Sequence, residues 1–178
     1  LYVVGGFTLA GGVAATNIAR WNGSNWSAVG GGLEGALSAI AVSSASNVYV
    51  ARFLTVPNEG SRTEVVHWNG TNWTVIAAGF GYPGNYGYVR SMALIRNDLF
   101  VAGKFTSFSQ LTANNIARWD GTNWLALGSG LVGSEEWQPN SMTLTYVSTL
   151  AVHGNELFVG GSFTNAGGVP ASNVAKWD

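Results

Sequence analysis

WNGSNW at 21–26 returns as WNGTNW at 68–73 and as WDGTNW at 119–124. Each copy places Asn-Gly or Asp-Gly between two tryptophans. These dipeptides are typical of tight β-hairpin turns because they accept positive φ angles at low cost. Side chains alternate between the faces of a strand, so a loop of two or of four residues puts both tryptophans on one face. The stretch therefore predicts a hairpin that the chain uses three times.

A second motif recurs with the same spacing. Strand-like segments occur at 1–8 (LYVVGGFT), 48–55 (VYVARFLT), 99–106 (LFVAGKFT) and 157–164 (LFVGGSFT). A shorter segment follows each one and ends in tryptophan: NIARW at 17–21, EVVHW at 64–68, NIARW at 115–119 and NVAKW at 173–177. These tryptophans are 47, 51 and 58 residues apart. That period fits one four-stranded propeller blade and is too long for a leucine-rich or ankyrin unit.

The strands of one repeat are lettered A to D from the expected propeller axis outward. Strand A is the short apolar segment at 37–42, 90–95 and 148–153, and strand B is the LYVVGGF type, whose paired glycines allow close backbone approach. Strand C ends at the first tryptophan of the hairpin, and strand D begins at the second. The repeats are expected at about 1–36 (strands B to D), 37–88, 89–146 and 147–178 (strands A to C). The predicted fold is all-β: a single β-propeller segment over 1–178, with four-stranded antiparallel blades, about 3.5 of them.

The repeat resembles the kelch and galactose-oxidase-type propeller repeats. It is most similar to repeats of bacterial surface or secreted propellers and of a related fungal cell-polarity marker, which follow the pattern LYVGGxFTxAGG, then NIAxWDGxxW. GGFTLAGG at 5–12 and NIARWNGSNW at 17–26 carry the likeness, which extends over the whole chain. The second repeat departs from it, with Arg52 at a usual glycine and PNEGSRTE at 57–64. The resemblance implies a fold and little about activity, because propellers host many unrelated functions.

A closed propeller usually has at least four blades, and an open end exposes a sheet edge. We therefore expect the native chain to continue beyond both ends and supply the missing blades. A second copy of the chain is the other candidate for that partner.

Composition excludes several classes of protein. Only 10% of residues are charged and the net charge is -1, which argues against a nucleic-acid partner. No apolar run approaches the roughly 18 residues of a membrane span. The chain has no cysteine, which excludes disulfides, a zinc-thiolate site and a cysteine nucleophile. The expected location is extracellular or at the cell surface.

The candidate binding residues lie in the D-A connections. In an up-and-down sheet the A-B and C-D turns share one end, and the B-C and D-A connections share the other. The D-A connections lengthen along the chain, at 30–36, 77–88 and 128–146. They hold the aromatic and acidic residues that the repeat does not require: Tyr82, Tyr86, Tyr88, Glu135, Glu136, Trp137 and Tyr146. If these rings are exposed, they suit binding of an apolar side chain of a partner protein or of the face of a sugar. The alternative is that they pack over the ends of the sheets and are buried.

Other motifs have structural explanations. GGGLEG at 30–35 and GSGLVG at 128–133 match a dinucleotide-binding pattern, but a strand or a polar loop follows in place of the required helix. The residue before each strand C tryptophan is basic or histidine (Arg20, His67, Arg118 and Lys176) and lies on the face opposite the tryptophan. There we expect it to pair with loop carboxylates or to face solvent. His67 and His153 occupy unrelated positions and make no metal site. Asn22, Asn25, Asn69 and Asn72 lie in glycosylation sequons, but the hairpin explains them.

The sequence thus predicts no catalytic residue, no cofactor and no metal. The leading interpretation is a non-enzymatic propeller that serves as a protein-interaction or structural platform through its B-C and D-A connections. One alternative is a carbohydrate-binding propeller that uses Tyr82, Tyr86, Tyr88 and Trp137. Another is the scaffold domain of a larger enzyme whose catalytic residues lie elsewhere.

Overall fold

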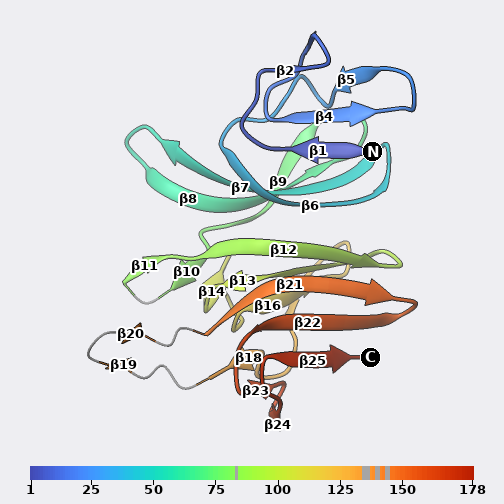
Figure 1. Cartoon of the computed structure of the whole chain (residues 1–178). Helices are drawn as coiled ribbons and strands as arrows, with labels where there is room; N and C mark the ends of the chain where they lie inside the picture. Colours follow the sequence, from blue (N-terminus) through green and yellow to red (C-terminus); the bar gives the residue numbers. More distant parts are fainter. Residues whose placement is uncertain (83, 134–136, 139–140, 143–144) are drawn as a thin grey trace. The chain divides into compact units, whose positions relative to one another are not determined.

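The computed structural model describes residues 1–82, 84–133, 137–138, 141–142 and 145–178. All regular secondary structure in these residues is β-strand, which confirms the all-β class. The chain forms two compact units, Leu1–Ala78 and Gly79–Asp178 (Figure 1). The boundary falls in the connection between the second and third repeats.

The first unit contains two antiparallel sheets and one small hairpin. The three-stranded sheet has the order β1 (Tyr2–Val4), β4 (Ile18–Trp21) and β5 (Trp26–Ala28). The four-stranded sheet has the order β6 (Ala36–Ser44), β7 (Asn47–Val56), β8 (Gly60–Trp68) and β9 (Trp73–Ala78). The hairpin is β2 (Leu9–Ala10) with β3 (Val13–Ala14).

The second unit repeats this organisation. Its four-stranded sheet has the order β12 (Tyr88–Ile95), β13 (Asp98–Lys104), β16 (Ile116–Trp119) and β17 (Trp124–Ala126). Its three-stranded sheet has the order β21 (Tyr146–His153), β22 (Glu156–Ser162) and β25 (Val174–Trp177). We call these two sheets and the two of the first unit the repeat sheets. Their strand order confirms the predicted order of strands A to D within each repeat.

Short strands make up the connections of the second unit. One small sheet contains β10 (Gly81–Tyr82), β11 (Asn85–Tyr86), β14 (Ser107–Phe108) and β15 (Leu111–Thr112). Another contains β18 (Leu131–Val132), β23 (Asn165–Ala166) and β24 (Val169–Pro170). The pair β19 (Trp137–Gln138) and β20 (Ser141–Met142) lies in the last D-A connection.

Each unit has its own apolar core, which joins its two repeat sheets. In the first unit, Ile18 of β4 is fully buried with Val48 and Val50 of β7. In the second, Phe100 of β13 is buried in one cluster with Leu150 of β21 and others. Fully burying one such side chain contributes about 1.5–3 kcal/mol. These clusters therefore hold neighbouring sheets together within a unit.

The tryptophan hairpins have four-residue loops. Trp21 faces Trp26 across the two strands, with ring centroids 5.3 Å apart, and the pairs at 68/73 and 119/124 repeat the arrangement at 5.4 and 5.3 Å. This confirms the prediction that both tryptophans share a face. Asn22 acts through its side chain: its Oδ1 accepts hydrogen bonds from the backbone N–H groups of Ser24 and Asn25. Asp120 does the same in the third hairpin, while the following glycine supplies the positive φ.

At the end of strand B, close packing requires glycine at one position, which Gly103 and Gly161 occupy. A Cβ on Gly103 would lie 2.0 Å from the carbonyl oxygen of Tyr88, and one on Gly161 would lie 2.3 Å from that of Tyr146. Each glycine N–H donates to the carbonyl of a left-handed asparagine, Asn115 (φ 64°) and Asn173 (φ 66°) respectively. The glycine and the asparagine therefore form a hydrogen-bonded pair at the place where strand C begins beside the end of strand B.

The second repeat has an ion pair in place of this glycine–asparagine pair, which explains its departure from the pattern. Arg52 stands at the glycine position and Glu64 at the asparagine position, as direct partners in the ladder. Arg52 Nη2 lies 2.7 Å from Glu64 Oε2, and Arg62 Nε lies 2.7 Å from Oε1 of the same carboxylate, which is 2% exposed. Burial raises the pKa of Glu64, but hydrogen bonds from Arg62 and Arg52 outweigh burial, so the pKa is below its ordinary value. With a regular ladder here, β7 and β8 continue to the hairpin tip.

Candidate binding surface

The B-C and D-A connections meet at one end of the sheets, as predicted. In the second unit, Gly81 of a D-A connection pairs with Ser107 of the following B-C hairpin. The next D-A connection pairs in the same way, Leu131 with Ala166 and Val132 with Asn165. Backbone hydrogen bonds therefore fix these segments as short strands, which makes the surface more regular than the loops that the sequence predicted.

The predicted site residues occupy different environments. Tyr82 lies in β10 and Tyr88 begins β12, and both are half-buried, whereas Tyr86 in β11 is 58% exposed. The alternative in which the rings pack over the ends of the sheets therefore applies in part to Tyr82 and Tyr88. Trp137 lies in β19, where its backbone pairs with Met142. The predicted Glu135 and Glu136 lie outside the described residues.

The structure brings three of the predicted tyrosines together with two cations that the sequence did not single out. Lys104 Nζ lies 3.8 Å from the ring centroid of Tyr82, and Lys104 is the cross-strand partner of Tyr88. The Arg90 guanidinium carbon lies 5.1 Å from the ring centroid of Tyr88 and 5.3 Å from that of Tyr146. Tyr82, Lys104, Tyr88, Arg90 and Tyr146 thus form a set in which rings and cations alternate, called here the aromatic-cation row.

A comparison among the repeats is the signal that could have found the two cations. Arg90 stands where the other two A strands have Ser38 and Ser148, and Lys104 stands where strand B of the last repeat has Ser162. Both substitutions place a positive charge at the same end of the third repeat.

Several cations elsewhere in the described residues form ion pairs with carboxylates. Arg118 Nη2 lies 2.8 Å from Asp98 Oδ2, and Lys176 Nζ lies 2.6 Å from Glu156 Oε1. These pairs support the expected pairing of the basic residues that precede the strand C tryptophans, although the carboxylates belong to strand B. His67 hydrogen-bonds Asn47 and stacks on Tyr49, and burial lowers its pKa. A ring of unpaired cations at these positions is therefore absent from the described part of the chain.

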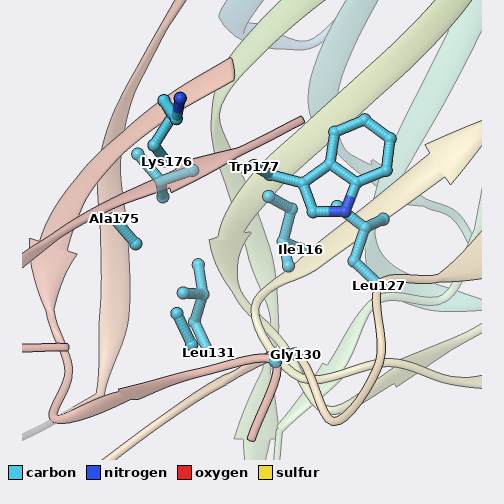
Figure 2. A pocket seen from close by; sticks show the side chains of 10 residues that line it. Ile116, Leu127, Gly130, Leu131, Ala175, Lys176 and Trp177 are labelled. Carbon is cyan, nitrogen blue, oxygen red and sulfur yellow. The ribbon is translucent and has the colours of Figure 1, made fainter. Parts of the chain in front are cut away.

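The second unit contains, beside a more open hollow of about 420 Å³, a small apolar cavity. It measures about 80 Å³ and is lined mainly by apolar side chains, among them Ile116, Leu127, Leu131 and Trp177 (Figure 2). Small-molecule sites usually measure about 300–1,000 Å³, so this cavity is too small for one. Its position next to the strand C tryptophan makes it part of the packing between the two sheets of that unit.

The two glycine-rich motifs lie in connections and short strands. GGGLEG at 30–35 leads into strand β6, and GSGLVG at 128–133 contains β18, so neither opens a helix. Searching the described residues finds no group of three histidine, cysteine, aspartate or glutamate side chains placed to hold a metal. Nor do those residues include a helix of the length and apolar character needed to cross a membrane.

Comparison of the chain with protein-family models, with curated proteins and with solved structures found no match in any of the three.

Proposed function

We propose that this chain is a segment of an extracellular or cell-surface β-propeller, and that it acts as a non-enzymatic platform for a partner protein. The order of strands supports the propeller: every repeat sheet is an up-and-down meander, and each unit packs two consecutive sheets through one core. The A strands β12 and β21 are neighbours, joined by a hydrogen bond from the Leu150 N–H to Ser91 Oγ (3.0 Å). Adjacent innermost strands of a propeller would have this relation.

The aromatic-cation row is the observation that carries the binding role. It lies where two kinds of connection meet on a rigid sheet, which is the usual place of function in such scaffolds. Tyrosine and arginine are also the residues that most often dominate protein interfaces. A half-buried ring held by a cation loses little side-chain entropy on binding, so the row is suited to anchor a partner.

Carbohydrate binding is the second candidate, because Tyr86 is 58% exposed beside the row. An accessible tyrosine ring offers a flat apolar face and a polar tip, the combination that a sugar requires.

Parallel screens of the full chain separate these two functions. The immobilised chain is screened against a random-peptide phage library and a glycan array, and ligands are retested on Tyr86→Ser. Thr122→Ala is the matched control, since Thr122 is exposed in the β16–β17 hairpin of the same unit, away from the B-C and D-A connections. Peptide ligands that Tyr86→Ser weakens and Thr122→Ala retains support the platform. If only glycans behave this way, the protein is a lectin. If no ligand depends on Tyr86, the proposed surface is wrong.

A further inference from the structure

We infer that Arg90, between Tyr88 and Tyr146, binds a carboxylate in an acidic segment of the partner protein. This inference rests on the proposed function and specifies what the platform recognises.

The contacts of Arg90 leave its hydrogen-bonding groups available. Both tyrosine rings lie within the roughly 6 Å at which a cation and a ring attract each other. No hydrogen bond or ion pair of the described residues uses the Arg90 guanidinium, so the N–H groups around its edge remain for another group. That edge presents its donors as a rigid fork, which matches the two oxygens of a carboxylate.

The backbone holds Arg90 in place. It occupies a β-bulge of β12, where the register with β13 shifts between Val89 and Ser91. Ser91, the next residue, accepts the hydrogen bond from Leu150 of β21, the strand that begins at Tyr146. The two tyrosines therefore come from strands that are fixed to each other, and the guanidinium is oriented before a ligand arrives. Preorganisation of this kind reduces the entropy lost on binding.

Arg90 itself has no counter-charge within the described residues. Arg90 is exposed, and no carboxylate of those residues forms an ion pair with it, whereas Arg52, Arg62, Arg118 and Lys176 each have one. Because this exposed guanidinium has no carboxylate partner among the described residues, it complements an acidic segment.

The same contacts favour a protein segment over an acidic sugar. A sugar binds such a site by stacking on ring faces, but the faces of Tyr88 and Tyr146 that meet Arg90 are already covered. What remains is the edge of a guanidinium on an open surface, which an aspartate or glutamate side chain can reach.

The chain provides its own matched substitution for a test. Serine occupies the position of Arg90 in the other A strands, at Ser38 and Ser148, and both are bulged in the same way. Arg90→Ser is therefore compatible with the backbone. Arg96→Asn is the control: it removes the same charge from an exposed arginine at the end of β12, at a φ of 56° that asparagine tolerates.

The experiment titrates the full chain with a fluorescein-labelled peptide of four Glu-Gly repeats at low salt, with the Gln-Gly peptide as the neutral reference. Fluorescence anisotropy gives affinity, and the ¹⁵N signals of the arginine side chains show which arginine responds. We expect Arg90→Ser to weaken binding about tenfold or more and Arg96→Asn to change it less than twofold. Arg90→Lys keeps the charge but loses the fork, so it should bind with intermediate affinity.

Several results would overturn the inference. Equal affinity of the native chain and Arg90→Ser would do so, as would failure of the native chain to bind the acidic peptide. Preferential, Arg90-dependent binding of oligogalacturonate over the peptide would assign the site to an acidic sugar instead. In the first two cases, peptides from the phage screen that depend on Tyr86 would still support the proposed function.

Discussion

Two adjacent glycines of β22 should respond very differently to the same substitution. A Cβ on Gly161 would lie 2.3 Å from the carbonyl oxygen of Tyr146 and 2.9 Å from the Cα of Val147. Both are backbone atoms of β21, so the clash is relieved only by moving one strand away from the other. A Cβ on Gly160 would meet only the Thr149 methyl group, at 3.1 Å. That methyl group ends a side chain and can shift slightly.

The expected magnitudes follow from these contacts. Forced overpacking costs about 1–3 kcal/mol and sometimes more, and a backbone contact belongs at the upper end, so Gly161→Ala should lose about 3 kcal/mol. Gly160→Ala reproduces Ala102, its counterpart in β13. The reduced entropy of the unfolded chain gains about 0.4–1 kcal/mol, which offsets the methyl contact and keeps the net change within about 0.5 kcal/mol of zero.

Urea denaturation followed by tryptophan fluorescence measures both free energies of unfolding, and a thermal melt should show the melting temperature of Gly161→Ala lowered by roughly 6–12 °C. Equal stability of the two variants would show that the strand A to strand B approach is looser than described. The role proposed for glycine at the position of Gly103 and Gly161 would then be wrong.

Three further predictions concern the first unit and its hairpins. Glu64→Gln leaves Arg52 without a full counter-charge and should lower the free energy of unfolding, measured by urea denaturation, by about 3–5 kcal/mol. The double change Arg52→Gly with Glu64→Asn, which restores the residues of the other repeats, should cost less. A larger cost for the double change than for Glu64→Gln would refute the pairing. Because burial lowers the pKa of His67, the unfolded chain takes up the proton first, so the unfolding free energy should fall as the pH drops below about 6.5. His67→Gln should flatten this fall, and an unchanged slope would contradict it. Asn22→Asp should keep the hairpin, since Asp120 performs the same role, while Asn22→Ala loses two hydrogen bonds within the turn and should cost about 1 kcal/mol; equal melting temperatures would disprove a stabilising role for these hydrogen bonds.

The sequence predicted the strands well because each repeat states the same information several times. The tryptophan hairpins illustrate this: an even loop fixes the shared face of Trp21 and Trp26 whether it contains two or four residues. The loop length itself was left open, because Asn-Gly suits both. The side-chain hydrogen bonds of Asn22 settle it, and they also explain why Asp120 substitutes for asparagine in the third copy.

The site was predicted less completely. Tyr82 and Tyr88 were identified from loop composition, yet their partners Lys104 and Arg90 belong to strands whose pattern gave no reason to single them out. Which ring meets which cation depends on the bulge at Arg90 and on the pairing of Tyr88 with Lys104. These ring–cation contacts cannot be deduced from the alternation of side chains between the two faces of a strand.

The proposed propeller requires that every repeat sheet follow the previous one by the same rotation about one axis. The chain has no cysteine, so pairs of spin labels can be attached without background at the tips of the tryptophan hairpins, at Ser24, Thr71 and Thr122. The distance from Ser24 to Thr71 spans one step within the first unit, and the distance from Thr71 to Thr122 spans the step from the first unit to the second. Double electron–electron resonance should give the same narrow distance for both steps. A clearly different or broad distribution for the second step would contradict the propeller.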